Sequence, residues 1–286
     1  MIVACIVWFP RLVEAFRATE QQVKPPPQQL TAGGQLQVSG LDAGACMSFA
    51  ATASATGKTV FVDPGHGGLD PGVVGSSGGR QVLEKDATLA VATRLASLLR
   101  GDGYRVVLAR TADTSAIKLS PSDSVTGSLT DGAEHRDLVT RATCANAANA
   151  SVLVSIHFDG FVDPSVGGTE TFYDAARPFS NDNKRLALDL QGALVTGLGT
   201  SDRGVWPDDQ VNAPTLTTSG SAYGHLIELG PQLTGWVDDP SRMPGALVEP
   251  LFITHPQEAR IAADPAGQQQ MAVALEAGLQ KYFSGA

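Results

Sequence analysis

From residue 58 onwards, the chain alternates between short continuous apolar runs and longer stretches in which apolar residues recur every three or four positions. Residues 59–62 are an apolar, β-rich run that ends in a turn at residues 63–65, which predicts a buried strand. Apolar residues then recur at helical spacing over residues 84–99, and residues 104–109 form another β-rich run. A strand, a helix and a strand in succession predict a βαβ unit in a largely parallel sheet.

The same alternation continues towards the C-terminus and determines the expected fold. We expect helices over residues 137–146, 183–198 and 268–283, and strands over residues 152–156, 169–173, 224–229 and 245–248. Together these elements predict an α/β fold, a three-layer αβα sandwich whose central, mostly parallel, twisted sheet is flanked by helices.

Two polar segments interrupt this pattern. Residues 115–134 are rich in Ser, Thr, Asp and Gly and have no apolar face, and residues 232–242 form a second polar insertion just before a predicted strand. Long loops inside a compact domain are often functional. We therefore expect the first segment to be a lid or a specificity loop.

The first 57 residues differ in composition from the rest of the chain. Residues 2–9 are apolar, but no Lys or Arg precedes them and they are too short to span a membrane. Three interpretations stay open for them: the end of a secretory signal whose start lies upstream, an apolar segment that packs on the domain, or the start of a cytoplasmic protein. Residues 20–57 contain three consecutive prolines and many Gln, Gly and Ser residues, which indicates a linker or a loosely packed arm. We therefore divide the chain into a leader remnant with its arm, residues 1–57, and a folded domain, residues 58–286.

Composition narrows the class of protein. The 286 residues are 43% hydrophobic and 17% charged, which is enough apolar content for a full core. The formal net charge is -9 and no basic run is present, which argues against binding to nucleic acid phosphates. No stretch of apolar residues is long enough for a complete transmembrane helix. Of the three cysteines, Cys46 and Cys144 are either an oxidised pair or two unpaired small apolar residues, and the sequence leaves both open.

Three side chains at the ends of predicted elements have the chemistry of metal ligands. His66 follows the first predicted strand within a Gly-rich turn, Glu84 opens the following helix, and His157 ends the predicted strand at 152–156. In open α/β sheets, ligands bind at the carboxyl ends of the strands. Two imidazoles and one carboxylate leave the fourth position of a zinc ion for water, as in catalytic sites. Each residue alone is more often structural, so the argument depends on their combination.

Short motifs follow one another in order between residues 58 and 283. They are Val60-Phe61-Val62-Asp63-Pro64-Gly65-His66-Gly67-Gly68, the helix at Glu84, Leu108-Ala109-Arg110-Thr111, Asn146 with Ser155-Ile156-His157, Gly168-Thr169-Glu170-Thr171-Phe172-Tyr173, Asp202-Arg203-Gly204-Val205 and Met243-Pro244-Gly245-Ala246-Leu247-Val248-Glu249. In this order, the motifs closely resemble those of the zinc-dependent N-acetylmuramoyl-L-alanine amidases of bacterial cell walls, the amidase type 3 family.

This resemblance implies a site and a reaction. It implies that His66, Glu84 and His157 bind Zn²⁺ and that Glu249 is the catalytic carboxylate, acting as general acid and base. The reaction implied is hydrolysis of the amide bond between N-acetylmuramic acid and L-alanine of the peptidoglycan stem peptide. Residues 58–286 would then be the zinc amidase catalytic domain of a secreted, periplasmic or cell-wall-associated protein. Nothing in the sequence demands more than a monomer.

Glu228 is the alternative to Glu249 as the catalytic carboxylate. The run Leu226-Ile227-Glu228 superficially looks like the family's terminal Leu-Val-Glu signature. Only Glu249, however, is preceded by Met-Pro and followed by an apolar turn and a C-terminal helix, so Glu249 is preferred. Glu228 is then expected to shape the groove or to pair with an arginine.

The chain also departs from the family pattern. Pro250 stands where the family usually has glycine, which removes a backbone N–H next to Glu249. His255 stands where the family usually has Asn, and we expect it to cap a helix or lie at the surface. His135 and His225 have no motif around them and are expected not to bind the metal, whereas Asp159 is expected at the rim or behind a ligand. 

Two other functions remain as alternatives. A zinc carboxypeptidase-like peptidase would use the same ligand types, but those enzymes usually place the first two as His-x-x-Glu, whereas His66 and Glu84 lie 18 positions apart. A non-catalytic peptidoglycan-binding protein would be expected to have lost a ligand or the catalytic glutamate. All four positions are filled in this chain.

Overall fold

The computed structural model describes residue 30 and residues 33–210 and 223–285. Its centre is an eight-stranded sheet in the order β1-β2-β6-β3-β9-β12-β10-β11. The strands are β1 Gly34–Gln35, β2 Ala45–Phe49, β3 Thr59–Pro64, β6 Arg105–Arg110, β9 Val152–Ile156, β10 Thr169–Tyr173, β11 Asp202–Pro207 and β12 Gly245–Glu249. The apolar leader at residues 2–9 lies outside the described residues.

Four neighbouring strands in the middle of the sheet are parallel. β6, β3, β9 and β12 pair in parallel, whereas β2 joins β6 and β10 joins β12 in antiparallel pairs. β11 then pairs in parallel with β10. The expectation of a mostly parallel sheet is confirmed, and its antiparallel members lie at the two sides.

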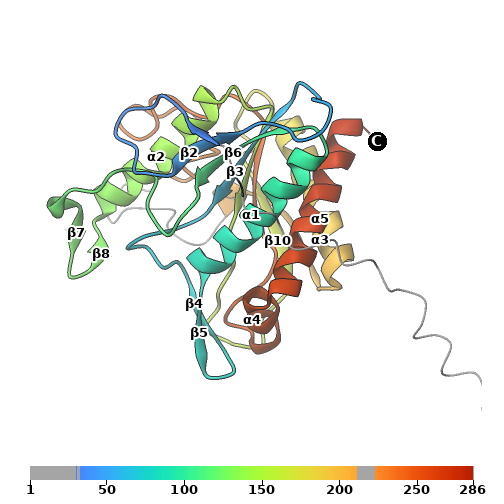
Figure 1. Ribbon diagram of the computed structural model, residues 1–286. Coiled ribbons are helices and arrows are strands. Elements are labelled where there is room, and N and C mark those ends of the chain that lie inside the picture. Colours follow the sequence, from blue (N-terminus) through green and yellow to red (C-terminus); the bar gives the residue numbers. More distant parts are fainter. Residues whose placement is uncertain (1–29, 31–32, 211–222, 286) are drawn as a thin grey trace, which may run out of the picture.

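Helices cover both faces of the sheet, as Figure 1 shows. α1 Glu84–Gly101, α3 Ser180–Leu198 and α5 Pro265–Ser284 pack on one face, where their apolar residues form the larger core cluster with side chains of the central strands. α2 Asp131–Ala147 and the segment at residues 223–243 cover the other face. The short helix α4 Pro256–Ala263 connects β12 to α5. The α/β sandwich is therefore confirmed, and among the described helices none has both the length and the apolar character needed to cross a bilayer.

Helix starts follow from local capping. α2 begins at Asp131, earlier than expected, because the Thr130 side chain accepts a hydrogen bond from the Ala133 backbone N–H. α4 was not expected; His255 occupies its N-cap and accepts from the Glu258 N–H, so the capping role predicted for His255 is confirmed.

The predicted strand at residues 224–229 is wrong. These residues form turns rather than a ladder, and their apolar side chains Ile227 and Leu229 are buried in clusters on the α2 side of the sheet. A short apolar run shows only that a segment is buried, so the run could not distinguish a strand from a loop that covers a sheet face.

The structure also contains strands that the sequence analysis missed. β1 and β2 lie in the segment expected to be a linker or loose arm, and β2 is a partly buried strand hydrogen-bonded to β6. The expectation of a loose arm is therefore wrong for these strands, whereas the division of the chain at residue 58 stays a prediction. β11 was missed because it is a largely exposed strand at the side of the sheet.

Two hairpins project from the sandwich (Figure 1). β4 Val74–Ser77 and β5 Arg80–Leu83 are joined by the glycines at 78 and 79, whose φ angles of 57° and 77° suit a tight hairpin turn. β7 Ser124–Val125 and β8 Ser128–Leu129 lie inside the polar segment at 115–134. The role of that segment as a lid or specificity loop stays a prediction.

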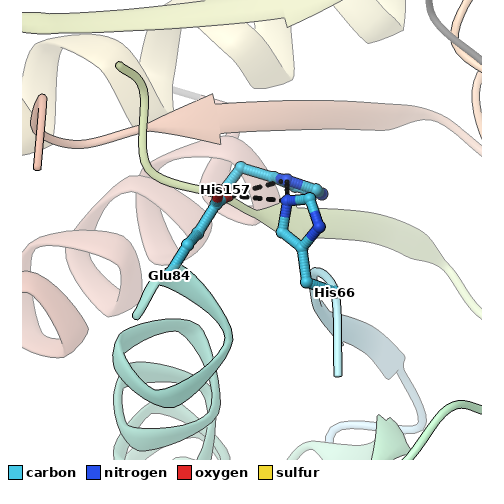
Figure 2. A group of neighbouring side chains, drawn as sticks. All are labelled: His66, Glu84 and His157. Atoms are coloured by element: carbon cyan, nitrogen blue, oxygen red, sulfur yellow. Dashed lines mark hydrogen bonds and ion pairs between the residues drawn. The ribbon is translucent and has the colours of Figure 1, made fainter. Parts of the chain in front are cut away.

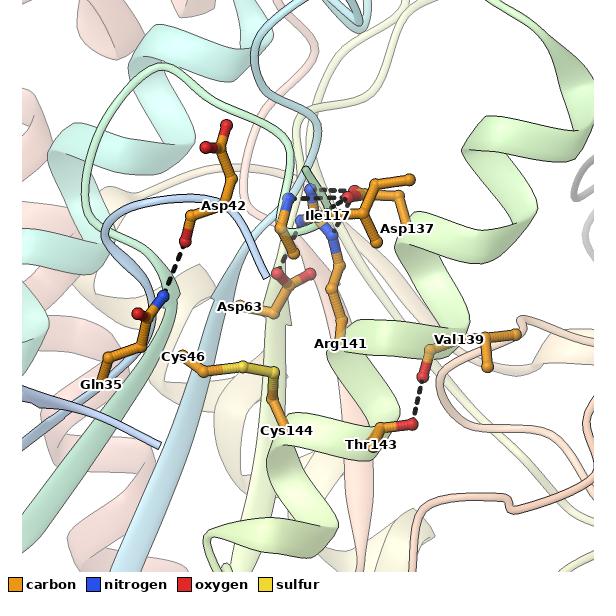
Figure 3. Close-up of a disulfide and its surroundings, with 11 residues drawn as sticks. Gln35, Asp42, Cys46, Asp63, Ile117, Asp137, Val139, Arg141, Thr143 and Cys144 are labelled. Atoms are coloured by element: carbon orange, nitrogen blue, oxygen red, sulfur yellow. Dashed lines mark hydrogen bonds and ion pairs between the residues drawn. A yellow bond between two sulfur atoms is a disulfide. The ribbon is translucent and has the colours of Figure 1, made fainter. Parts of the chain in front are cut away.

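A disulfide connects β2 to the helix on the second face. Cys46 lies on β2 and Cys144 on α2, both are fully buried, and their Cα atoms are 5.7 Å apart (Figure 3). That separation is within the usual range for disulfides. The structure therefore resolves the pairing that the sequence left open.

We expect reduction of the Cys46–Cys144 disulfide to lower the free energy of unfolding by about 2–4 kcal/mol, because it removes a crosslink that restricts the unfolded chain. Denaturant unfolding curves with and without dithiothreitol measure this change. The double variant Cys46→Ala/Cys144→Ala is the control, since its curve should not respond to the reductant. Identical curves for the oxidised and reduced wild-type protein would contradict a bonded pair.

Candidate metal centre

The carboxyl ends of β3 and β9 bring two histidines together. These strands are parallel neighbours, so both end at the same edge of the sheet. His66 lies two residues beyond β3, and His157 directly follows β9. Glu84 is the first residue of α1 and points at the same place, as Figure 2 shows. The structure therefore brings together the three residues that the sequence analysis singled out as ligands.

The donor atoms of these three side chains have the spacing of ligands around one small cation. His66 Nε2 lies 3.0 Å from Glu84 Oε1, and His157 Nδ1 lies 3.1 Å from Glu84 Oε1 and 3.1 Å from His66 Nε2. Zinc–ligand bonds of about 2.1 Å in tetrahedral geometry place donors roughly 3.4 Å apart. A set of two nitrogens and one oxygen also matches the ligand types that zinc prefers. The described residues therefore fit a zinc ion.

Hydrogen bonds orient two of these ligands. Asp70 Oδ2 lies 2.7 Å from His66 Nδ1, which places the proton on that nitrogen and leaves Nε2 facing the other ligands. The Glu84 carboxylate accepts backbone N–H groups at both oxygens, from Val73 to Oε2 (2.7 Å) and from Phe158 to Oε1 (2.9 Å). Sequence analysis missed Asp70, although its position four residues after His66 in the same turn is a signal that could have identified it.

Two glycines leave the space that the ligands occupy. A Cβ atom at Gly65 would lie 2.4 Å from His157 Nε2. A Cβ atom at Gly72, whose φ is 64°, would lie 2.5 Å from Glu84 Oε2. Any larger residue at either position would push a ligand out of place, so these glycines are required by packing around the site and not only by the turn.

Two buried arginines hold the turn that carries His66. Arg141 donates from Nη1 to the Pro64 carbonyl (3.0 Å) and from Nη2 to the His66 carbonyl (2.8 Å). Arg110 donates from Nε to the Pro64 carbonyl (3.0 Å) and from Nη2 to the Gly65 carbonyl (2.9 Å). His66 has a φ of 61°, a strained conformation for a residue with a side chain. The four charge-assisted hydrogen bonds fix this conformation.

The electrostatics of the site favour a bound cation. Burial alone lowers the pKa of His66, but the Glu84 carboxylate and the hydrogen bond that His66 donates to Asp70 outweigh it and raise that pKa to about 10. Burial alone would raise the pKa of Glu84, but the adjacent His66 and His157 hold it well below its usual range. The Glu84 carboxylate thus stabilises positive charge beside it, and a metal ion would compete with the proton for His66.

Glu249 ends the strand next to the one that carries His157. β12 pairs with β9, and the His157 N–H donates to the Val248 carbonyl (2.9 Å). One oxygen of Glu249, Oε2, is buried and has no hydrogen-bond partner in the described part of the chain. Burial raises the pKa of Glu249 well above its usual range, and the negative charge of Glu84 raises it further. Glu249 is therefore a carboxyl with a high proton affinity at the same edge as the ligands.

Two more carboxyls, Glu170 and Asp159, lie close enough to Glu249 for their charges to raise its pKa. Glu170 is the register partner of Glu249 across β10 and β12, and its Oε2 lies 3.3 Å from Arg203 Nε. Burial and a hydrogen bond with Glu170 raise the pKa of Asp159 to about 8. The structure thus places Asp159 beside this carboxyl pair, whereas Asp70 is the carboxylate that orients a ligand.

Glu228, the alternative catalytic carboxylate, lies on the α2 side of the sheet. It is buried, and its Oε2 is 3.4 Å from Ser155 Oγ. Asp63, His157 and Glu228 also lie close enough to share a metal ion. Arg141 Nη1, however, forms an ion pair with Asp63 at 2.7 Å, so a buried cation already neutralises this group (Figure 3). Glu228 thus lies behind the three ligands as part of the arginine network.

Two other histidines have partners outside the ligand cluster. His135 Nε2 lies 2.8 Å from the Trp236 carbonyl oxygen, a contact that anchors the loop at residues 232–242 to α2. His225 contacts Asp174 and Asp208 at distances of 2.9 and 3.3 Å. Neither histidine contacts the three clustered ligands.

The chain matches known proteins over most of its length. A family model described as N-acetylmuramoyl-L-alanine amidase matches residues 60–281. The chain is 30% identical to the N-acetylmuramoyl-L-alanine amidase LytC of Bacillus subtilis over 227 residues, 79% of this chain and 36% of that protein. It is also 30% identical to the germination-specific N-acetylmuramoyl-L-alanine amidase of Bacillus subtilis, over 80% of this chain and 81% of that protein.

A solved structure shows the same architecture. The CwlD amidase from Clostridioides difficile, determined in complex with the GerS lipoprotein, superposes with a TM-score of 0.62 at 26% identity. The match covers 80% of this chain and 100% of that chain. Together with the family match over residues 60–281, this shows that the chain belongs to the N-acetylmuramoyl-L-alanine amidase family, amidase type 3.

Proposed function

We propose that this protein hydrolyses the amide bond between N-acetylmuramic acid and L-alanine of the stem peptide in peptidoglycan. His66, Glu84 and His157 bind Zn²⁺, and Glu249 is the general base and acid. The observation that carries the proposal is the convergence of three ligand atoms, all about 3 Å apart, at the sheet edge where Glu249 also ends its strand. Relatives named as N-acetylmuramoyl-L-alanine amidases support the choice of bond.

Each residue has a distinct role in the reaction. When bound, zinc supplies Lewis acidity, which acidifies water and polarises the scissile carbonyl. His66, Glu84 and His157 supply the donor atoms, and Asp70 keeps the His66 ring in the tautomer that presents Nε2. Glu249 takes a proton from the attacking water and passes it to the nitrogen of the departing peptide. Its raised pKa suits a carboxyl that must hold that proton between the two steps.

The alternatives have less support. The family match is to amidases, and no observation favours a carboxypeptidase-like peptidase over them. A non-catalytic binding protein is disfavoured because all four positions are filled and the three ligand positions converge. The chain spans only about a third of the length of LytC, 36%, so the proposal concerns the reaction of this chain alone.

We further propose that the protein acts outside the cytoplasm, as a secreted, periplasmic or cell-wall-associated enzyme. Its substrate is in the cell wall, and the buried Cys46–Cys144 disulfide suits an oxidising compartment. The expected monomeric state stays a prediction. 

The variant Glu249→Gln should keep its metal but lose hydrolysis by a factor of about 10²–10⁴, because it removes the proton-transfer group without removing a ligand. Release of stem peptide from purified muropeptides, together with metal content by mass spectrometry, measures both properties. The isosteric change Glu228→Gln is the matched control, since the same substitution behind the site should leave hydrolysis within about tenfold of wild type. The reverse pattern would make Glu228 the catalytic carboxylate.

The variant Asp70→Asn should weaken zinc binding by about 10- to 100-fold, because the His66 ring loses the carboxylate that orients it. Competition titrations against a chromogenic chelator give the affinity. Asp86→Asn is a suitable control because Asp86 is an exposed carboxylate on the first turn of α1. Equal zinc affinities for the two variants would show that Asp70 does not orient the ligand.

A further inference from the structure

A second group of metal-ligand side chains lies at the other edge of the sheet. Asp174 and Asp208 directly follow β10 and β11, whose last residues Tyr173 and Pro207 are register partners. β10 runs antiparallel to β12, so this end of β10 is opposite to the edge where Glu249 ends its strand. His225 comes from the turns that cover the second face of the sheet. These three residues are therefore separate from the ligands at the first site.

The distances in this group match those in the first site. His225 Nδ1 lies 2.9 Å from Asp174 Oδ2 and 3.3 Å from Asp208 Oδ1. The three donor atoms all lie within 4.8 Å of one another, as they do for the ligands at the first site. Asp174 and Asp208 are buried, and the His225 side chain is 22% exposed, the same fraction as that of His66.

The two carboxylates are oriented towards the histidine by backbone hydrogen bonds. The Ala176 N–H donates to Asp174 Oδ1 (2.7 Å), and the Leu226 N–H donates to Asp208 Oδ2 (2.9 Å). The remaining oxygen of each aspartate faces His225 Nδ1. Asp174 Oδ2 is fully buried and accepts no hydrogen bond of good geometry within the described ranges, which is the behaviour of an oxygen placed for a cation.

Among the described residues, side chains with a permanent positive charge form no direct ion pair with Asp174 or Asp208, although the charges of Arg177 and Asp174 interact. Arg177 is nearby, but its guanidinium donates to the backbone carbonyls of Leu229, Gly230 and Ser241. Burial and the charge of the nearby Asp174 raise the pKa of Asp208 to about 6. Two buried negative charges side by side are costly unless a cation lies between them.

We propose that Asp174, Asp208 and His225 form a second divalent-cation site, whose one nitrogen and two oxygens suit Zn²⁺. This revises the expectation that His225 is not a ligand. Asp208 precedes residues 211–222 in the chain and His225 follows them. A shared ion would therefore connect Asp208 and His225 to Asp174 at the end of β10. The chain after His225 continues to Ile227 and Leu229, which pack on the second face of the sheet. The site therefore fastens this covering segment and takes no part in hydrolysis.

The test is zinc stoichiometry in the full chain. The protein is stripped with a chelator, reloaded with Zn²⁺ alone and desalted, and bound zinc per chain is measured by plasma mass spectrometry. The variants are Asp174→Asn and His225→Gln at the second site and Glu84→Gln at the first. Asp174→Asn keeps the Oδ1 atom that accepts the Ala176 N–H, so it removes the charge with little change of shape.

We expect two zinc ions in the wild type, one in each single variant and none in Glu84→Gln/Asp174→Asn. Zinc affinity at the second site should fall by at least about 100-fold in Asp174→Asn. Mutation of a residue that only orients a ligand already lowers metal affinity about 10- to 100-fold, and Asp174 is a proposed ligand itself. Asp174→Asn should also keep amide hydrolysis, which Glu84→Gln loses. Zinc should raise the melting temperature of Glu84→Gln but not of the double variant.

Other results would overturn the proposal. One zinc ion in the wild type that is lost in Glu84→Gln, or a second ion that survives in both Asp174→Asn and His225→Gln, would show that this cluster binds no metal. If circular dichroism shows that Asp174→Asn is unfolded, His225→Gln and the stoichiometry of Glu84→Gln decide the question. If the Glu84→Gln variant binds one zinc ion, the second site is supported even if the wild-type protein shows no hydrolysis.

Discussion

Two buried guanidinium groups beneath the turn after β3 are the constraint on which the candidate metal centre depends. Arg110 and Arg141 together bind the carbonyls of Pro64, Gly65 and His66. They extend this support to the helices, because Arg110 also donates to the Lys85 carbonyl at the start of α1 and Arg141 lies on α2. The turn, the helix that carries Glu84 and the helix on the other face are thus joined through charge-assisted hydrogen bonds from two buried side chains.

The turn geometry explains why the ligands are so close. His66 has a left-handed backbone, which only a fixed turn maintains, and the parallel register of β3 and β9 delivers His157 to the same edge. Glu84 lies in the first turn of α1, and the backbone N–H groups of Val73 and Phe158 orient its carboxylate by donating hydrogen bonds to it. Burying two arginines and straining the backbone of His66 both destabilise the fold. A function at this site would explain why the arrangement is present.

The sequence predicted the parts of the molecule that local patterns encode. The central strands and three of the four long helices at nearly full length were identifiable from apolar or periodic runs. The same runs drew attention to His66, Glu84 and His157, whose donor atoms converge in the structure, whereas Glu249 was chosen through the family resemblance and its role stays a proposal. Features that depend on contacts between distant parts of the chain could not be identified from local patterns. The strand β2 lies in a Gly-rich segment without an apolar period, and the turns at 224–229 show the same apolar run as a strand. Asp70 and Arg141 act through partners that no short window contains.

The central claim is that a zinc ion held by His66, Glu84 and His157 cuts the bond between N-acetylmuramic acid and L-alanine. Mass spectrometry of peptidoglycan fragments digested by the zinc-loaded protein tests it most directly. The account predicts stem peptides with a new N-terminal L-alanine and glycan strands freed of peptide, with no release after the metal is removed. Fragments with new carboxyl termini inside the stem peptide, or undiminished release from metal-free protein, would contradict it.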